Sequence, residues 1–195
     1  MYVNDFDKNG TTEQIICTYN GDKSYPMVLR HDLMMQIPSL KKKYLKYDNF
    51  KDQTIQDIFT EEELKGAVKL EAYELSSGML INDGNGKFTF KSLPVDAQFS
   101  TMYAIDIFDY DGDGIVDILL GGNLYRVKPE AGRYDASYGV FLKGAGKGEF
   151  NVMTLRSSGL AFDGEVRDFT RLHLPGKNVL LVARNNDTVL CFKTR

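Results

Sequence analysis

A repeated acidic pattern in the middle of the sequence places the strongest constraint on what this chain can form. Residues 109–117 read DYDGDGIVD, with acidic side chains at positions 1, 3, 5 and 9 and glycine at position 6. Alternate acidic residues direct their oxygens to one side of a tight loop, and the glycine permits the positive-φ turn that closes it. Hard divalent cations with six or seven oxygen ligands, calcium above all, need this arrangement. The alternative is an acidic turn between two strands, because Asp-Gly pairs favour turns without any metal.

The predicted ligands of this loop are four carboxylates and one backbone carbonyl: Asp109, Asp111, Asp113, Asp117 and, through its carbonyl, Ile115. An EF-hand would carry a glutamate at position 12 and a helix on each side. Here position 12 is Leu120, and apolar runs rich in β-branched residues flank the loop at 102–108 and 115–120. Such runs are typical of strands. The sequence therefore predicts a metal loop between two strands.

The same spacing occurs 104 residues earlier, where residues 5–13 read DFDKNGTTE. The predicted ligands of this first loop occupy the same positions: Asp5, Asp7, Asn9, Thr11 and Glu13. Asn9 replaces an aspartate, so this ligand set carries one negative charge fewer than the other. We therefore expect weaker calcium binding in the first loop than in the second.

A third copy lies 62 residues after the second and lacks the ligands. Residues 166–182 align with 104–120, and Gly176 falls on Gly114. The ligand positions of this copy hold Arg171, His173, Pro175 and Val179. We expect no metal there, so the strand–turn–strand unit is architectural and the metal is an addition to some copies.

A glycine-rich hairpin follows each acidic loop further along the chain. Residues 78–90 resemble residues 139–152, and both indicate strand, glycine turn, strand. The complete unit is strand, acidic loop, strand, long connection, strand, hairpin, strand. Four antiparallel strands that repeat at about 60 residues are typical of propeller blades.

The acidic loop and its downstream glycine hairpin together resemble the FG-GAP/VCBS repeats of integrin-α-like β-propellers, over nearly all of the chain except about residues 31–70. The resemblance implies that the loop between the first two strands of a blade binds calcium. It also implies that the chain is a C-terminal piece of a larger bacterial surface or secreted protein. We accordingly expect an extracellular, cell-surface or periplasmic location, although the N-terminus has no recognisable signal peptide.

The sequence thus predicts a mainly β fold of antiparallel four-stranded blades, forming a partial propeller of under three blades with a small helical insertion. We expect a single repeat domain over residues 1–195 with these parts: a first blade at 1–30 and 67–98, a helical insertion at 31–66, a second blade at 99–160 and an incomplete third blade at 161–195. Open blade edges predict self-association.

Composition limits the function classes. A net charge of −3 argues against nucleic acid as the main partner, and no apolar run approaches the ~20 residues that would predict membrane insertion. His31 and His173 lack zinc-type spacing, and no nucleophile or phosphate-loop motif is present. We expect a noncatalytic Ca²⁺-binding segment for adhesion, assembly, or protein or carbohydrate recognition. The alternative is part of a propeller enzyme, a polysaccharide or ester hydrolase or lyase. Its catalytic residues would lie on missing blades or at Arg126, Tyr134 and Arg167.

Overall fold

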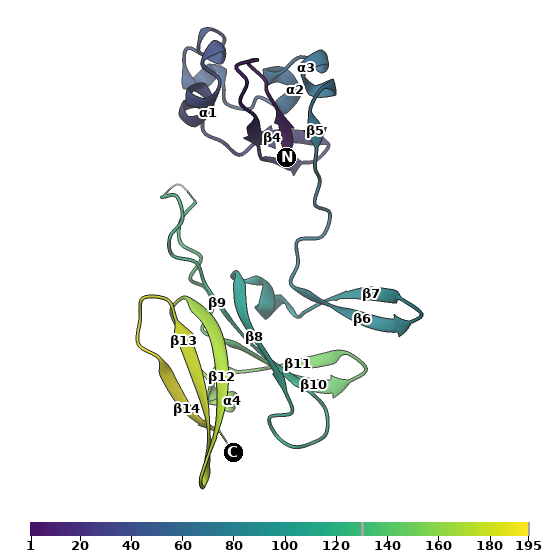
Figure 1. Ribbon diagram of the computed structural model, residues 1–195, viewed down its shortest axis with the longest axis vertical. Helices are drawn as coiled ribbons and strands as arrows, with labels where there is room; N and C mark the ends of the chain where they lie inside the picture. The colour runs from purple at the N-terminus through teal and green to yellow at the C-terminus, as the bar shows by residue number, and fades with distance from the viewer. Residues whose placement is uncertain (130, 195) are drawn as a thin grey trace. The chain divides into compact units, whose positions relative to one another are not determined.

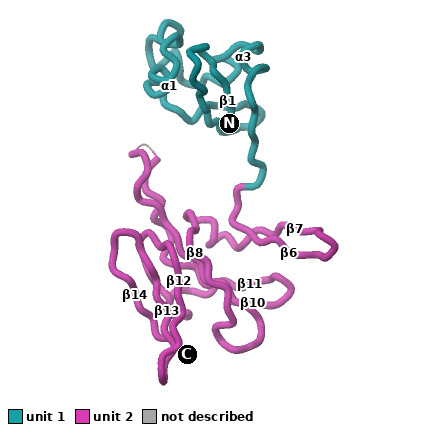
Figure 2. Tube along the Cα trace, in the orientation of Figure 1, with its two compact units in different colours: residues 1–74 teal, residues 75–195 magenta. Residues whose placement is uncertain are grey.

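The structure is a computed structural model that describes residues 1–129 and 131–194. It divides into two compact units, residues 1–74 and residues 75–195 (Figure 2). Antiparallel sheets of two to four strands form the framework of the chain, and the helical segments are short and lie mainly in the first unit, so the predicted mainly β fold is confirmed. In the part of the chain that is described, no helix combines the length and apolar character needed to cross a membrane.

The N-terminal unit combines two small sheets with the helical insertion (Figure 1). Its strands are β1 (Tyr2–Asn4), β2 (Glu13–Ile15), β3 (Cys17–Asn20), β4 (Lys23–Pro26) and β5 (Val68–Lys69). Its helical segments are α1 (Arg30–Gln36), η1 (Pro38–Lys42), η2 (Tyr47–Asn49), α2 (Ile55–Ile58) and α3 (Glu61–Lys65). Strand β1 pairs with β2 on one side and β5 on the other, while β3 and β4 form a hairpin.

The helical insertion gives this unit its own core. Ile15 of β2 is buried against Leu33 and Ile55 from the helices, and the Phe6 and Phe59 rings stack with centroids 4.2 Å apart. Because the helices cover the β1–β2 sheet directly, their apolar face is removed from water inside this unit.

Two successive capping boxes fix the starts of the last two helices. The Thr54 hydroxyl accepts the N–H of Asp57, whose carboxylate accepts the N–H of Thr54; Thr60 and Glu63 repeat the arrangement in α3. Each box satisfies two backbone donors that a helix start leaves free.

The C-terminal unit contains a two-, a four- and a three-stranded antiparallel sheet. Its strands are β6 (Gly78–Gly84), β7 (Lys87–Ser92), β8 (Met102–Phe108), β9 (Asp117–Gly122), β10 (Val140–Gly146), β11 (Glu149–Met153), β12 (Val166–Leu174), β13 (Lys177–Arg184) and β14 (Leu190–Thr194). Short helical segments η3 (Val95–Gln98) and α4 (Leu155–Ser158) join them. The four-stranded sheet has the order β11-β10-β9-β8, which is the meander expected of the second blade.

Strand β9 supplies both hydrophobic cores of this unit. Leu119 packs into a core with residues of β12 and β13, whereas Ile118 and Leu120 pack into a second core with residues of β10 and η3. A strand buried on both faces reads as a continuous apolar run, and residues 118–122 of β9, which read ILLGG, have no polar side chain.

The two glycine hairpins have the same backbone form. The β6–β7 turn has positive φ at Gly84, Asn85 and Gly86, and the β10–β11 turn has it at residues 146–148. Each hairpin also carries a register shift just before its turn. The repeat inferred from sequence therefore extends to the backbone geometry of these turns.

The third copy is a plain hairpin. Strands β12 and β13 pair as far as Leu174 and Lys177, so only Pro175 and Gly176 form the turn, and Gly176 has a φ of 78°. The glycine turn predicted at this position is confirmed, and β12, β13 and β14 form one three-stranded sheet.

The first blade differs from the prediction. The single four-stranded sheet expected from 1–30 and 67–98 is not formed among the described residues, because β5 takes the second edge of β1 and β6 pairs with β7 alone. The helical insertion at 31–66 forms a separate core with the β1–β2 sheet, so the chain divides near residue 74 instead of forming one repeat domain. Closure into a propeller and self-association stay predictions.

Candidate metal centre

The second acidic loop forms the corner between β8 and β9. Phe108 and Asp117 are opposite each other in the antiparallel pair, so the loop begins and ends at two directly paired residues of β8 and β9. Positive φ at Gly112 and Gly114, 79° and 83°, lets the chain reverse within this short span.

Asp109, at position 1, organises the loop. Its Oδ1 accepts the N–H groups of Gly112 at 2.7 Å and Asp113 at 3.1 Å, and its Oδ2 accepts the N–H of Gly114 at 2.8 Å. Asp113 in turn accepts the N–H of Ile115 at 2.9 Å. These bonds satisfy the backbone donors of a turn that has no ladder partner.

Asp117, at position 9, joins the loop to the rest of the sheet. Its side chain is buried, with Oδ2 accepting the N–H of Tyr110 at 3.0 Å and Oδ1 accepting the N–H of Gly144 at 2.8 Å. Gly144 permits this approach, since a Cβ there would lie 2.3 Å from the carbonyl oxygen of Val116. The corner is thus held against strand β10.

A lysine from β10 contacts the remaining two carboxylates. The Lys143 ammonium is bound to Asp111 and lies 3.4 Å from Oδ2 of Asp113. Its hydrogen bond to Asp111 holds the pKa of that carboxyl below the ordinary value, and the same contact raises the pKa of Lys143. The acidic groups of the loop therefore have the positively charged Lys143 ammonium beside them.

The first loop repeats the main hydrogen bonds of the second. Asp5, at position 1, accepts the N–H groups of Asn9 at 3.0 Å and Gly10 at 2.9 Å, at positions 5 and 6. Glu13, at position 9, is buried and accepts the N–H of Phe6, at position 2, at 2.9 Å. In both loops the position-1 carboxylate accepts the N–H groups at positions 5 and 6 and the position-9 carboxylate accepts the one at position 2, so the two loops share this framework.

One oxygen of the first loop has no partner. Oδ1 of Asp7 is buried and accepts no hydrogen bond from any described residue. Thr11 donates its N–H to the Asn9 side-chain oxygen at 2.7 Å, and its hydroxyl lies 3.4 Å from Oε1 of Glu13. A buried acceptor without a donor is costly in a protein but is what a metal ligand requires, so the residues of this loop fit a cation.

The structure brings three carboxylates together in each loop. Ligand oxygens of Asp5, Asp7 and Glu13 lie within 4.8 Å of one another, and so do those of Asp109, Asp111 and Asp117. These are distances from which one hard cation can be reached by all three groups. Asp113, the fourth carboxylate of the second loop, lies outside this group.

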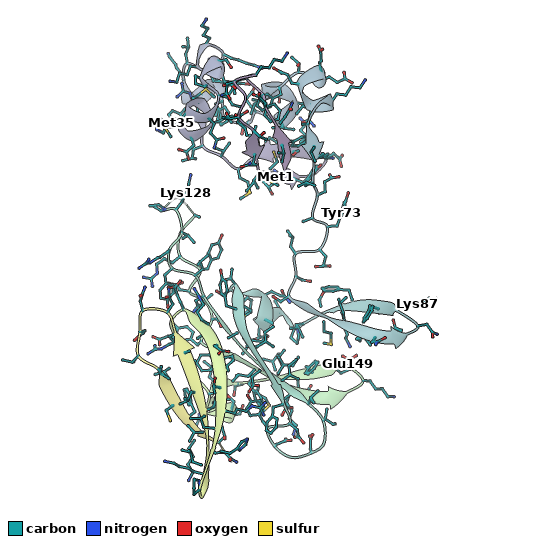
Figure 3. All side chains as sticks on the ribbon, viewed as in Figure 1. Met1, Met35, Tyr73, Lys87, Lys128 and Glu149 are labelled. Atoms are coloured by element: carbon teal, nitrogen blue, oxygen red, sulfur yellow. The ribbon has the colours of Figure 1, made fainter. Side chains whose placement is uncertain are left out.

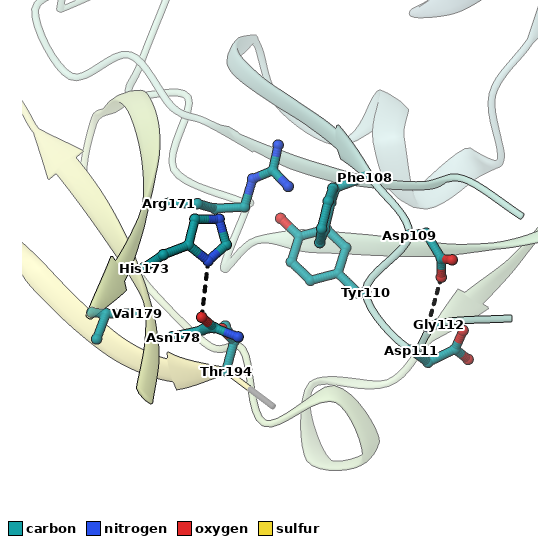
Figure 4. Close-up of a pocket in the computed structure, with 10 residues that line it drawn as sticks. All are labelled: Phe108, Asp109, Tyr110, Asp111, Gly112, Arg171, His173, Asn178, Val179 and Thr194. Atoms are coloured by element: carbon teal, nitrogen blue, oxygen red, sulfur yellow. Dashed lines mark hydrogen bonds between the residues drawn. The ribbon is translucent and has the colours of Figure 1, made fainter. Parts of the chain in front are cut away.

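A cavity of about 380 Å³ lies beside the second loop within the same unit (Figure 4). Arg171 and His173 of β12 line one side of it, and Phe108 and Tyr110 line the other. The guanidinium of Arg171 lies 3.7 Å from the Phe108 ring centroid and its Nε lies 3.1 Å from Oδ2 of Asp106. This face combines an aromatic ring with a fixed cation.

Tyr110 and Asp106 form a second link between the loop and its strand. The Tyr110 hydroxyl donates to Oδ2 of Asp106 at 2.5 Å. Burial, followed by this hydrogen bond, raises the pKa of Tyr110 above its ordinary range, so the phenol stays protonated. It can donate a hydrogen bond but is not a base at neutral pH.

Arg167, one of the residues considered for catalysis, makes structural contacts. Its guanidinium donates to the carbonyl of Asn123 at 3.0 Å and to Glu165 at 2.9 Å, and it stacks over the Tyr103 ring. The N–H of Tyr125 also donates to Glu165 and, as the largest cause, lowers its pKa. Glu165 is accordingly a charged side chain that is hydrogen-bonded to both Arg167 and the Tyr125 backbone. Tyr134, another of the residues considered for catalysis, pairs with Leu124 through its backbone as an isolated β-bridge.

Lys143 and Gly144 are the site residues that sequence reasoning missed. Both come from β10, 26 residues or more beyond Asp117, and neither belongs to the loop pattern. The available signal was the hairpin repeat, because Ile81 and Lys143 occupy the same place, three residues before the glycine that follows the register shift of each hairpin. The position is apolar in one hairpin and a lysine in the other, and this difference between the two repeats points to Lys143.

Comparison with known proteins adds one finding. Residues 73–120 match the family model described as an FG-GAP-like repeat, a stretch that runs through β6, β7 and β8 to the second acidic loop and β9. No curated protein and no solved structure shows significant similarity to the chain.

Proposed function

Because residues 73–120 carry an FG-GAP-like repeat, we propose that this chain is a noncatalytic, calcium-binding segment of a β-propeller that recognises a protein or carbohydrate outside the cell. FG-GAP-like repeats are typical of propeller-type domains in extracellular and adhesion proteins. The observation that carries the calcium part of the proposal is the shared construction of two loops, each with three carboxylates within 4.8 Å.

The role proposed for the cation is structural. Calcium would be held by the carboxylates of each loop, with Asn9 contributing an amide oxygen in the first, and would neutralise groups that otherwise repel one another. Asp109 and Asp5 orient the loop backbone through their N–H bonds, and Asp117 fixes the second loop to β10. These residues bind and position; none is placed to move a proton onto a substrate.

The first expected result is that calcium raises the thermal stability of the protein. A ligand that binds only the folded form adds about 1.4–2.7 kcal/mol when present at 10 to 100 times its dissociation constant, roughly the excess that 10 mM calcium gives over an extracellular-type site. Differential scanning calorimetry of the full chain in calcium and in chelator measures this shift. Asp111→Ala combined with Asp113→Ala should remove the part that belongs to the second loop.

The matched control for that double variant is Asp135→Ala. Asp135 is an exposed aspartate of the same unit, outside both acidic loops, so its loss changes the net charge without touching the ligand set. The control should keep the full calcium shift. Identical melting curves in calcium and chelator for the unmodified protein would rule out structural calcium.

The second expected result concerns Asp7, whose substitution should lower the stability in calcium but not in chelator. In chelator, Asp7→Asn removes an unpaired buried carboxylate oxygen next to Asp5 and Glu13, so stability should stay constant or rise by about 1 kcal/mol. In calcium the variant lacks a charged ligand and should be less stable than the unmodified protein by a similar amount. Asp22→Asn, in the exposed β3–β4 turn, is the control.

Equal shifts of Asp7→Asn in both conditions would show that Asp7 has no calcium-dependent role. The alternative of a propeller enzyme gains no specific support from the site, because Arg167 is already bound to Glu165 and to the Asn123 carbonyl.

A further inference from the structure

We propose that Lys143 competes with the cation for the second loop, so that calcium binds the first loop more tightly even though the second has more carboxylates. This inference rests on the proposed calcium binding and concerns which of the two loops is filled first. It reverses the order expected from the ligand charges alone.

The position of Lys143 is set by the sheet. Its neighbour in β10, Gly144, donates its N–H to Asp117. The Lys143 side chain itself reaches Asp111 and Asp113. Consecutive residues of one strand therefore fix the corner and place an ammonium group against two of its ligands. A side chain supplied by a paired strand loses less freedom on contact than one from a loop.

The ammonium cancels the charge advantage of the second loop. Four aspartates give that loop a charge of −4, and Lys143 reduces it to −3. The first loop has −3 from Asp5, Asp7 and Glu13, and among the described residues no ammonium or guanidinium group forms an ion pair with them. Counted as ligand carboxylates together with the cations that pair with them, the two sites therefore carry the same charge; Lys8, at position 4 of the first loop, is exposed and forms no ion pair with these carboxylates.

The two loops also differ in what must move. For Asp111 to turn both oxygens to a metal, its contact with Lys143 must break, and the ammonium must leave the neighbourhood of a divalent ion. Oδ1 of Asp7 has no partner to give up. Among the described residues, therefore, the second loop alone has a paired cation that calcium must displace and that then repels it.

The competing cation belongs to one repeat only. In the β6–β7 hairpin the place of Lys143 is taken by Ile81, which lies against Gly148 of the neighbouring hairpin, as the contacts of a Cβ at Gly148 show. The lysine is therefore not a requirement of the hairpin, and its replacement by an apolar residue is compatible with this type of strand.

Calorimetric calcium titration of the full chain at low ionic strength tests the inference. In the Asp7→Ala background, which leaves only the second loop intact, Lys143→Met should tighten calcium binding by about three- to tenfold, the range of an exposed ion pair plus one repelling charge. Lys143→Arg keeps the charge and should bind no more tightly than the lysine. Lys87→Met, at the tip of the β6–β7 hairpin, controls for net charge and should leave the affinity unchanged (Figure 3).

The order of filling is a second readout. With Lys143 in place, Asp7→Ala should remove the tighter of two binding phases, and Asp111→Ala with Asp113→Ala should remove the weaker one. Melting in chelator establishes that each variant is folded, and Lys143→Gln replaces the methionine variant if that one is not.

The outcomes separate this inference from the proposed function. Calcium binding that Lys143→Met and Lys143→Gln leave unchanged overturns the competition but keeps the calcium sites. A second loop that binds more tightly than the first in the unmodified protein also overturns it. Absence of calcium binding in every variant overturns both.

Discussion

Replacing Asn123 with alanine is expected to destabilise the C-terminal unit by about 4 kcal/mol, because it leaves several buried backbone groups without partners. Oδ1 of Asn123 accepts from the Ser100 hydroxyl at 2.8 Å and from the Ser137 N–H at 3.0 Å. Its Nδ2 donates to the carbonyls of Ser137 at 2.8 Å and Gly164 at 3.1 Å. The buried Asn123 amide therefore joins three separate segments of the unit, which contain Ser100, Ser137 and Gly164.

Backbone strain contributes separately to this result. Asn123 has a φ of 77°, a conformation that costs alanine about 1 kcal/mol. Asn186, at an exposed turn with a φ of 54°, has the same strain without buried hydrogen bonds, so Asn186→Ala is the matched control. Asn123→Gly relieves the strain but not the lost bonds. Urea or calorimetric unfolding that gives equal losses for the 123 and 186 alanine variants would contradict the hydrogen-bond explanation.

The second large effect is expected at Gly122, where alanine should cost about 3 kcal/mol or more through overpacking. A Cβ at this residue would lie 1.7 Å from the carbonyl oxygen of Thr101 and 2.9 Å from the Cα of Met102. Both obstacles are backbone atoms, so no rotamer change relieves them. The Thr101 carbonyl also accepts the N–H of Asn123 at 2.9 Å, and a shift of the strand would weaken that bond.

Gly66 provides the control for this substitution. It has an ordinary φ of −79° at the end of α3, and the nearest atom to an added Cβ lies 3.6 Å away. Gly66→Ala should be neutral or stabilising by up to about 1 kcal/mol. A Gly122→Ala protein with the stability of the Gly66 variant, measured by denaturant unfolding, would show that β8 and β9 can separate without cost.

The acidic loops were predictable because their determinants are local. All the predicted ligand groups of each loop lie within nine residues, and the glycine at position 6 has the positive φ that the pattern requires, 89° at Gly10 and 83° at Gly114. The glycine hairpins and the capping box at Thr60 were predictable for the same reason. Local spacing constrains local geometry.

Contacts between distant segments were not predictable in this way. Lys143 reaches Asp111 across 32 residues, and Asn123 bonds Gly164 across 41. Neither residue differs in type from many exposed lysines and turn asparagines elsewhere in the chain, so only the strand pairing reveals its role. The same limitation explains the first blade, since the pairing of β5 with β1 depends on two residues with no strong strand pattern.

The hydrogen bonds that Asp5 and Asp109 make to their own loops have a consequence for how these two residues can be used. In each loop the position-1 carboxylate accepts the backbone N–H groups at positions 5 and 6 through its two oxygens, so it shapes the corner from within the loop. A carboxylate oxygen has more than one acceptor lone pair, so these bonds leave capacity for a cation as a further partner. The proposed calcium would therefore share its position-1 ligand with the turn, and replacing Asp5 or Asp109 would damage the backbone of the corner together with the ligand set.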